Sequence, residues 1–478
     1  MSIQRRQLVK ALGALAAGGS LVGREGIARE AATTLSKVPR PERPNILLLC
    51  IDDLRDWVGY LGEHPGVHTP HIDRLREEAL SFDRAYCSVP VCRPSRGSML
   101  WGLSAPTAGF TGDSRGDTRA YSALLESQDL QPLPVWFSRA GYTTIGTGKV
   151  FHRPAKAYWD DYLGYRLKSQ REMLGDHGTF FDFGALPADV VHPDQVSAEF
   201  ATRNLQAAHD KPWFMAVGLM LPHVPWRVPQ WAFDLHPLDD VALPRVREDD
   251  LDDIPELGRQ AVGGKFEIKG TPMTQHELIL YRGLWREHVQ AYLASCSHTD
   301  VMVGQILDAL AKSEYADNTA VVLWSDHGYH LGEKLRWRKM ALWEQATRVP
   351  LLIKAPWRVQ GGDSFAEPVS LLDLGPTLMD LADLPVPGQF EGRSLLGIDV
   401  QAARARPALM YWNSGYSVRV GKWRWTRYRD GTEELYDLNT DPEEFDNLVG
   451  PAGWHKGGME ALLRDAEPAR IPLRSQQG

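Results

Sequence analysis

Cys92 is one of only four cysteines in a chain of 478 residues, and the residues around it are polar and turn-forming. It lies in the stretch VCRPSRGSML at residues 91–100, directly before Arg93 and Pro94. Four cysteines are too few for a disulfide framework in a chain of this length. Cys92 is therefore a core residue, a thiol in a loop or a residue that takes part in a reaction. A free cysteine is commonly buried and unreactive.

Two acidic motifs follow apolar runs of the chain. Asp52 and Asp53 come directly after NILLLCI, and Asp326 and His327 come after TAVVLWS. Adjacent carboxylates repel each other unless a cation lies between them, and carboxylate oxygens suit Ca²⁺ or Mg²⁺. The pattern therefore indicates a hard-cation site, in which histidine is the less usual ligand. A helix N-cap or a solvated loop is the plainer interpretation of two adjacent aspartates.

Four basic residues are candidate contacts for an anion: Lys149, His152, His223 and Lys339. Each alone is typical of a surface or structural group, whereas together, at the ends of predicted strands, they indicate a cationic cup. The formal net charge of -8 argues against a general nucleic-acid-binding protein. An anionic ligand must therefore be met by cations grouped locally.

The order of apolar runs and helical periods predicts how these residues are positioned. Continuous apolar runs at residues 45–51, 142–146, 213–219, 319–325 and 349–354 are typical of buried strands in a parallel sheet. Helical periods lie between them at residues 70–80, 133–140, 277–312 (with one break) and 371–382. This alternation predicts an α/β fold with a doubly wound, mostly parallel sheet and helices on both faces. Ligands of such sheets bind at the carboxyl ends of the strands, where the polar residues lie.

Three regions differ in composition. Residues 1–40 contain Arg5 and Arg6 followed by a weakly apolar run that is too short to span a bilayer, where roughly 20 apolar residues are needed. We expect an export signal of the twin-arginine type and a periplasmic protein without a stable membrane anchor; a basic tail is the alternative. Residues 41–400 form the predicted α/β domain. Residues 401–478 alternate apolar and polar side chains, which predicts a smaller C-terminal subdomain with an antiparallel sheet.

Residues 92–96, CRPSR, match the C-x-P-S-R signature of the formylglycine-dependent sulfatases of the alkaline phosphatase superfamily. The resemblance extends over residues 42–450 and includes NILLLCIDDLR, GTGKVFH, LPHVPWRVP, SDHGYHLGEKLRWRK and ELYDLNTDPEEFDNL. The chain most resembles the iduronate-2-sulfatase group, because Asp326 is followed by histidine and because the GKVFH and WRK motifs are present. The resemblance implies an alkaline phosphatase-like fold and the hydrolysis of sulfate esters.

The resemblance also implies that a formylglycine-generating enzyme oxidises Cys92 to an aldehyde. An aldehyde forms a hydrate, which a thiol cannot do. One hydroxyl of the hydrate attacks sulfur, and deprotonation of the other expels sulfate, so that release is intramolecular.

The family's functional residues have counterparts in this chain. The resemblance implies that Ca²⁺, rather than Mg²⁺, is bound by Asp52, Asp53, Asp326, His327 and the modified Cys92. Arg96 braces the hydrate, and His152 deprotonates it. Sulfate oxygens contact Lys149, His223 and Lys339, and either a lysine or His223 protonates the leaving alcohol.

The chain departs from the family pattern downstream of the signature. Trp101 stands where threonine is usual, and Leu103 stands where arginine is usual, in a segment that assists the modifying enzyme. The extent to which Cys92 is converted therefore stays open, although the geometry of the site does not.

The substrate is less well defined by the sequence than the reaction. We expect a sulfated sugar or a 2-sulfated uronic acid, with Arg336, and also Arg227 and Arg338, as candidates to bind a carboxylate. Ring stacking is an expectation for three aromatic residues, Trp226, Tyr329 and Trp343, although surface charge and core packing explain all six side chains equally well. The alternatives are a phosphonate monoester hydrolase or phosphodiesterase of the same superfamily, and a non-catalytic exported metal-binding protein.

Overall fold

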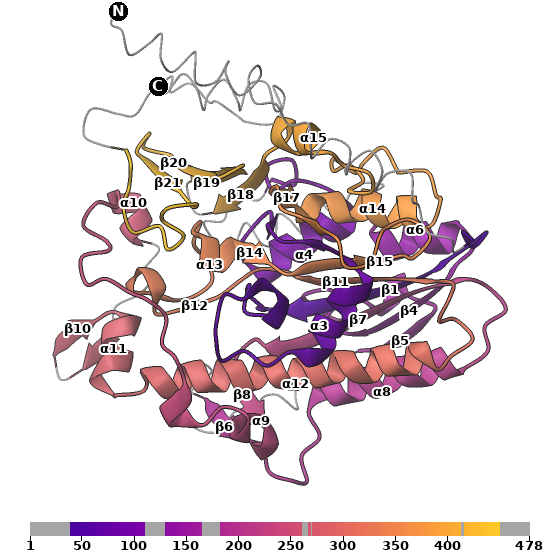
Figure 1. The fold of residues 1–478 in the computed structure, drawn as a ribbon, viewed down its shortest axis with the longest axis horizontal. Coiled ribbons are helices and arrows are strands. Elements are labelled where there is room, and N and C mark those ends of the chain that lie inside the picture. The colour runs from indigo at the N-terminus through magenta and orange to yellow at the C-terminus, as the bar shows by residue number, and fades with distance from the viewer. Residues whose placement is uncertain are drawn as a thin grey trace, which may run out of the picture.

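A computed structural model describes residues 39–109, 130–164, 182–260, 266–268, 270–412 and 415–449. Its centre is an eight-stranded sheet with the order β16-β2-β15-β11-β1-β7-β4-β5 (Figure 1). The strands of this sheet are β1 (Asn45–Asp52), β2 (Leu80–Phe82), β4 (Thr143–Gly148), β5 (Asp161–Leu163), β7 (Trp213–Pro222), β11 (Thr319–Ser325), β15 (Leu351–Lys354) and β16 (Ser364–Phe365).

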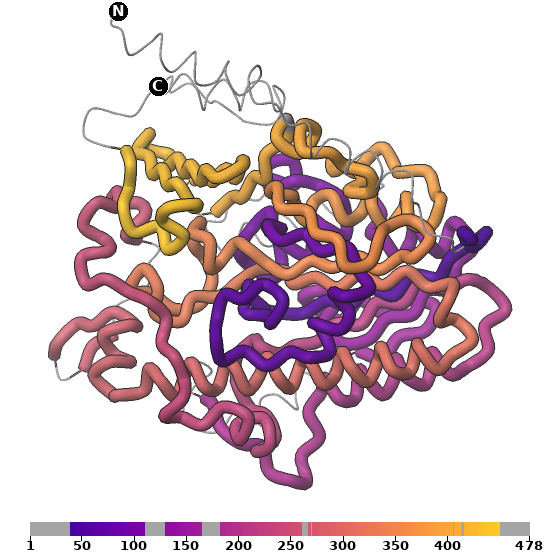
Figure 2. The backbone as a smooth tube through the Cα atoms, viewed as in Figure 1, coloured from indigo at the N-terminus to yellow at the C-terminus, as the bar shows by residue number. Residues whose placement is uncertain are grey.

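The five neighbouring strands β11, β1, β7, β4 and β5 are all parallel. They come from distant parts of the chain, and the indigo, magenta and orange segments lie interleaved in the backbone trace (Figure 2). The predicted mostly parallel sheet is therefore confirmed. The predicted strand at residues 349–354 differs in detail, because Pro350 separates β14 (Arg348–Val349) from β15 and β15 runs antiparallel to β11.

β1 lies at the centre because it is apolar on both of its sides. Ile46, Leu48 and Cys50 pack into a core on one face of the sheet. The alternate residues Leu47, Leu49 and Ile51 pack into the core on the other face. Side chains alternate across a strand, so a continuous apolar run buries both faces at once.

Helices cover both faces. The first core includes side chains from α4 (Cys92–Trp101), α6 (Leu133–Arg139) and α14 (Leu374–Leu381), and the second includes side chains from α3 (Pro70–Glu78), α8 (Pro193–Gln206) and α12 (Trp285–Ala311). The predicted break in the long helical period falls at Gly283, whose φ of 65° is in the left-handed region, between α11 (Gln275–Tyr281) and α12.

The C-terminal part carries a separate four-stranded antiparallel sheet (Figure 1). Its strands are β18 (Ala408–Trp412), β19 (Gly415–Val420), β20 (Trp423–Tyr428) and β21 (Glu433–Asp437). The turn between β20 and β21 has Gly431 at a φ of 84°, as the Asp430–Gly431 pair predicts. The α/β fold with a smaller antiparallel sheet is thus confirmed.

Shorter elements connect the main ones. They are β3 (Ala85–Tyr86), β6 (Phe183–Ala185), β8 (Trp226–Val228), β9 (Phe266–Ile268), β10 (Thr271–Met273), β12 (His330–Leu331), β13 (Trp337–Arg338), β17 (Val369–Ser370), α9 (Gln230–Asp234), α10 (Glu256–Arg259), α13 (Glu344–Thr347) and α15 (Val400–Ala405).

The exact domain boundaries stay a prediction. The expected export signal at residues 1–40 falls, except for its last two residues, outside the described part of the chain. In the described part, every helix is too short or too polar to cross a membrane.

Candidate active site

Four of the predicted site residues follow strands at the same edge of the sheet. Asp52 is the last residue of β1, Lys149 follows β4, His223 follows β7 and Asp326 follows β11. β1 pairs in parallel with both β7 and β11, and β7 pairs in parallel with β4. The carboxyl ends of these strands therefore meet, and the sheet brings together residues that are far apart in the sequence.

The chain turns sharply at Asp53, directly after β1. Its φ is 62°, which is uncommon for a residue other than glycine. The amide of Asp53 donates to Oδ1 of Asp326 at 3.1 Å, and the hydroxyl of Tyr292 donates to the carbonyl of Asp53 at 2.8 Å. These two bonds hold the strained backbone.

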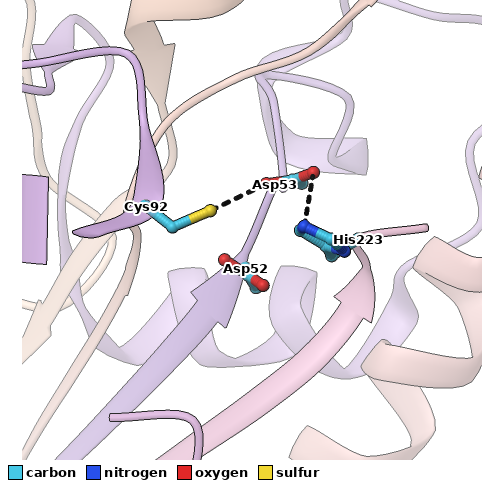
Figure 3. Close-up of side chains that lie close together, drawn as sticks. All are labelled: Asp52, Asp53, Cys92 and His223. Carbon is cyan, nitrogen blue, oxygen red and sulfur yellow. Dashed lines mark hydrogen bonds and ion pairs between the residues drawn. The ribbon is translucent and has the colours of Figure 1, made fainter. Parts of the chain in front are cut away.

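Cys92 is the first residue of α4 and is 3% exposed. Its Sγ lies 3.0 Å from Nζ of Lys339, 3.2 Å from Nε2 of His327 and 3.8 Å from Oδ1 of Asp53. Figure 3 shows the Cys92 side chain pointing from the helix towards Asp53 and Asp52. A helix N-terminus carries partial positive charge, so it adds to the cations around this sulfur.

These surroundings make Cys92 unlike the other buried cysteines. Burial by itself raises the pKa of a thiol, but Lys149, Lys339 and His327 lower the pKa of Cys92 well below its ordinary value. Burial raises the pKa of Cys50 to about 12, although Arg96 opposes this. The site therefore stabilises negative charge on whatever group occupies position 92.

Arg96 connects two of the buried carboxylates. It is 1% exposed, and its Nε donates to Oδ2 of Asp326 at 2.7 Å while its Nη2 lies 3.3 Å from Oδ1 of Asp52. The same guanidinium donates to the carbonyls of Lys149 and Ile51, so it fastens the ends of β1 and β4 together. Lys149 also forms an ion pair with Asp52.

The carboxylates respond in opposite directions to these partners. Burial and Cys92 oppose ionisation of Asp52, but Lys149, His223 and Arg96 hold its pKa below the ordinary range. Burial raises the pKa of Asp326 to about 7 in spite of Arg96. The cationic side chains of the protein thus balance the negative charge of Asp52, but they do not fully balance that of Asp326.

The residues around Cys92 fit a divalent cation. Two overlapping groups have ligand atoms within 4.8 Å of one another and share Asp52 and Cys92, one adding Asp53 and His223 and the other adding Asp326 and His327. The Nδ1–H of His327 donates to the Gly328 carbonyl at 3.0 Å, which leaves Nε2 as the ring nitrogen that faces the site. Buried carboxylate oxygens are donors for a hard cation.

Two further histidines lie at the rim. Nε2 of His223 is 4.0 Å from Oδ2 of Asp53 (Figure 3). The Nδ1–H of His223 donates to the Val224 carbonyl at 2.5 Å. The side chain of His152 forms a hydrogen bond with Cys92. The structure therefore brings together all ten predicted catalytic and metal-binding residues: Asp52, Asp53, Cys92, Arg96, Lys149, His152, His223, Asp326, His327 and Lys339.

Comparison with known proteins decides the family. The sequence profile described as sulfatase matches residues 44–384, and the profile described as the C-terminal part of N-sulphoglucosamine sulphohydrolase matches residues 332–460. The chain belongs to the sulfatase family.

The relatives of this sulfatase carry consistent names. A sulfatase of Formosa agariphila is 34% identical over 443 residues, which cover 88% of this chain and 86% of the relative. Iduronate 2-sulfatase of Mus musculus is 30% identical over 390 residues, which cover 72% of this chain and 69% of the relative. The predicted membership and the assignment as an enzyme that hydrolyses sulfate esters are thus confirmed.

Solved structures share the fold. A protein crystallised with its substrate D-glucosamine-2-N,6-O-disulfate has a TM-score of 0.69 and 21% identity, covering 91% of this chain and 100% of that chain. A phosphonate monoester hydrolase of Agrobacterium radiobacter has a TM-score of 0.65 and 20% identity, covering 86% and 92%. At these identities the likeness concerns the fold alone.

Arg336 of the sulfatase is buried and binds backbone carbonyls of the loop that carries Lys339. It is 3% exposed, and its guanidinium donates to the carbonyls of Lys339 at 2.5 Å and Met340 at 3.1 Å. These bonds support the shape of the loop that carries Lys339, and a contact of Arg336 with the substrate stays a prediction.

The aromatic residues expected to stack on a sugar are core residues in the sulfatase. Trp226 and Tyr329 are 0% exposed and Trp343 is 2% exposed, so none of them presents a ring face to a ligand. Arg227 pairs with Asp182, at 2.6 Å between Nε and Oδ1. Of the two interpretations left open for the aromatic residues, core packing is the correct one.

Sequence reasoning missed two residues that shape the site. Ser95 donates from Oγ to the Asp326 carbonyl at 2.5 Å, and Tyr292 fixes the carbonyl of Asp53. Ser95 belongs to the CRPSR signature, which was a signal for it. Tyr292 lies inside α12, where nothing in the sequence distinguishes it from other core aromatics.

Proposed function

We propose that this sulfatase removes sulfate from a sulfated sugar by means of a formylglycine made from Cys92. The observation that carries the proposal is the position of Cys92 Sγ among Lys339, His327 and Asp53. Conversion replaces sulfur on Cβ by oxygen, so Sγ stands in for that oxygen. An aldehyde hydrate supplies one hydroxyl that accepts the sulfuryl group and a second that drives its release.

The lysines have the charge that sulfate binding requires. Burial opposes ionisation of Lys149, but Asp52 raises its pKa to about 12, and Asp53 likewise raises the pKa of Lys339. Both side chains are ammonium groups at neutral pH. Together with His223, they would donate to sulfate oxygens and stabilise the charge that develops in the transition state.

Proton transfer would fall to the histidines. His152 is hydrogen-bonded to Cys92 and is placed to take a proton from the group at that position. His223 has its Nδ1–H engaged with the Val224 carbonyl and its Nε2 facing Asp53. Either His223 or one of the two lysines would give the leaving alcohol its proton.

We infer a calcium ion as the metal. Asp52, Asp53, Asp326 and His327, with the modified residue 92, would hold it, because three of these residues offer hard oxygen donors. The ion would supply positive charge beside the sulfate and the reacting oxygen. It would also balance the charge of Asp326, which Arg96 alone leaves incomplete.

A sugar substrate is supported by names among the relatives and fold neighbours. These include iduronate 2-sulfatase and a protein solved with a glucosamine disulfate. A 2-sulfated uronic acid is the specific substrate that we propose. Export through the twin-arginine route, read from Arg5 and Arg6, would place the enzyme in the periplasm.

The test uses protein produced together with a formylglycine-generating enzyme. Mass spectrometry of the peptide that contains residues 92–96 should show an aldehyde, and a panel of sulfated monosaccharides and oligosaccharides should be hydrolysed. Activity confined to choline or aryl sulfates would reject the sugar assignment. Faster turnover of phosphate esters than of sulfate esters with the same leaving group would favour the phosphonate-hydrolase alternative, and an unchanged thiol without turnover would favour a binding protein.

A further inference from the structure

A second cluster of possible metal ligands lies between α8 and α12. His192 is the N-cap residue of α8, Asp194 lies in the first turn of that helix, and His298 lies in α12. One ligand atom from each of these three residues lies within 4.8 Å of the others. The two helices run side by side across the second core face (Figure 1). The cluster shares no residue with the group around Cys92.

His298 has a nitrogen that the protein does not satisfy. The side chain is 2% exposed, and its Nδ1 has no hydrogen-bond partner. Its ring lies 5.0 Å from the ring of His192 and is stacked on Trp231 at 6.1 Å. A buried polar atom without a hydrogen-bond partner is unfavourable, so it points to a missing ligand.

His192 directs an unprotonated nitrogen at the same carboxylate. Its Nδ1 accepts the amide of Asp194 at 3.1 Å and lies 3.7 Å from Oδ2 of Asp194. A nitrogen that accepts an N–H carries a lone pair and no proton. A neutral imidazole with a lone pair is the form of histidine that binds metals.

Asp194 is a buried carboxylate without a lysine or arginine partner among the described residues. It is 1% exposed. Its two oxygens accept the amides of Met220 at 2.7 Å and Leu221 at 3.0 Å. These amides orient the carboxylate in the way that outer hydrogen bonds orient metal ligands.

We propose that His192, Asp194 and His298 bind one transition-metal ion of the zinc class, separate from the ion at the active site. Two imidazoles and one carboxylate are donors that suit Zn²⁺ and do not suit Ca²⁺. The ion would balance the Asp194 carboxylate and satisfy the unpartnered nitrogen of His298. A water molecule would complete a tetrahedral set of ligands around the ion.

The position of this site suggests a structural role. Asp194 holds the amides of Met220 and Leu221, which directly precede Pro222 and His223 at the end of β7. An ion that fixes the Asp194 carboxylate would therefore also fix the backbone that presents His223. This second site does not depend on the proposed formylglycine chemistry.

Two neighbours of the proposed ligands are exposed to solvent. Trp231, which covers His298, is 39% exposed, and Val191, next to His192, is 54% exposed. The cluster therefore has exposed side chains as neighbours.

The experiment measures metal binding in the full-length chain. We would use a Cys92→Ala background, in which the active-site thiol cannot bind zinc, remove metals with a chelator, and titrate with Co²⁺ and Zn²⁺. We expect one Co²⁺ per chain with visible absorption typical of nitrogen and oxygen ligands, displacement by Zn²⁺, and a melting temperature that rises with Zn²⁺. His298→Leu and His192→Leu should each lose the absorption and the rise.

The matched control is His288→Leu. His288 lies in the same helix, is 0% exposed and is not among the proposed ligands, so its replacement perturbs the core but should leave Co²⁺ binding intact. Absence of Co²⁺ binding in the Cys92→Ala protein would overturn the proposal, as would unchanged binding in His298→Leu and His192→Leu. If one ligand variant does not fold, the Co²⁺ titration of the background protein and the other ligand variant still decide the result.

Discussion

Nζ of Lys339 lies 3.0 Å from Sγ of Cys92, although 247 residues separate them in the sequence. The same ammonium group lies 2.7 Å from Oδ1 of Asp53. Lys339 therefore contacts both the reactive position and a proposed metal ligand. The ammonium group of Lys339 is therefore placed to contact the sulfate group of an ester bound at position 92.

We expect Lys339→Met to lower kcat/KM for a sulfate ester by about 10²- to 10³-fold, because it removes a charged donor aimed at the transition state. Lys339→Arg should not restore activity, since a planar guanidinium does not fit the position of a compact ammonium group. Lys422→Met is the control, because Lys422 is 41% exposed and pairs with Asp437 in the C-terminal sheet. Equal activity of Lys339→Met and wild type would remove Lys339 from the site.

Cys92→Ala should abolish turnover and leave the melting temperature close to that of the wild type. The control variant Cys296→Ala should keep full activity. It should lower the free energy of unfolding by about 1 kcal/mol through lost core packing, because Cys296 is 1% exposed inside α12. Assays of ester hydrolysis and thermal melts check both variants. Turnover by Cys92→Ala would contradict any role of residue 92 in the chemistry.

Removal of divalent ions should inactivate the sulfatase, and Ca²⁺ should restore it better than Mg²⁺, which demands a stricter octahedral geometry. Asp53→Asn should weaken Ca²⁺ binding, measured by calorimetry on chelator-treated protein. A matched variant is Asp437→Asn, whose carboxylate lies in the C-terminal sheet. Full activity after exhaustive chelation would show that the reaction needs no metal.

Asp300 should make stability depend on pH. It is 1% exposed and accepts the amides of His71 at 3.1 Å and Ile72 at 2.8 Å at the start of α3. Burial raises its pKa to about 7 in spite of these amides, and the carboxyl of an unfolded chain has a pKa of about 3.9. The folded protein therefore holds the proton more tightly, and stability present below about pH 4 is lost as the pH rises to about 7.

Between pH 5 and pH 8, the wild type should lose about 2–3 kcal/mol more unfolding free energy than Asp300→Asn, whose side chain does not titrate. Denaturant unfolding at both pH values measures this difference. The charge of Asp73 raises the pKa of Asp300 and the charge of Arg74 lowers it. Because salt screens both charges, all measurements are made at the same low ionic strength. Parallel pH curves for the two proteins would mean that Asp300 keeps an ordinary pKa.

Arg336→Gln should lower kcat more than it changes KM. The reason is that Arg336 is buried and supports the loop that positions Lys339. Steady-state kinetics with one sulfated sugar checks this split. A rise in KM alone would instead support the substrate contact expected from the sequence.

The fold was predictable where apolar runs are long. Residues 45–51 and 319–325 are long apolar stretches that are followed directly by aspartate, and they form β1 and β11 with these bounds or one residue more. The short strands β2 and β16 have three and two residues, which leave too little pattern to detect. The direction of β15 was not predictable, because a buried antiparallel strand has the same local pattern as a parallel one.

The residues that form the site were predictable from the sequence, whereas the directions of their side chains were less so. Polar residues that follow parallel strands must meet at one edge, so Asp52, His223 and Asp326 converge as expected. The sequence did not predict that Cys92 begins a helix, because Pro94 and Gly97 argue against one; a proline is tolerated in the first turn. Arg336 and Trp226 show the limit, since local sequence does not reveal which side chains point away from a cavity.

The burial of Cys92 has a consequence for the order of events in the cell. Arg96 and Asp326, whose ion pair closes this region, are 230 residues apart in the chain. At a synthesis rate of 5–20 residues per second, the ribosome releases the cysteine segment roughly 10 to 50 s before its covering strand exists. A macromolecule that modifies this thiol can reach it during that interval, before the folded chain buries it.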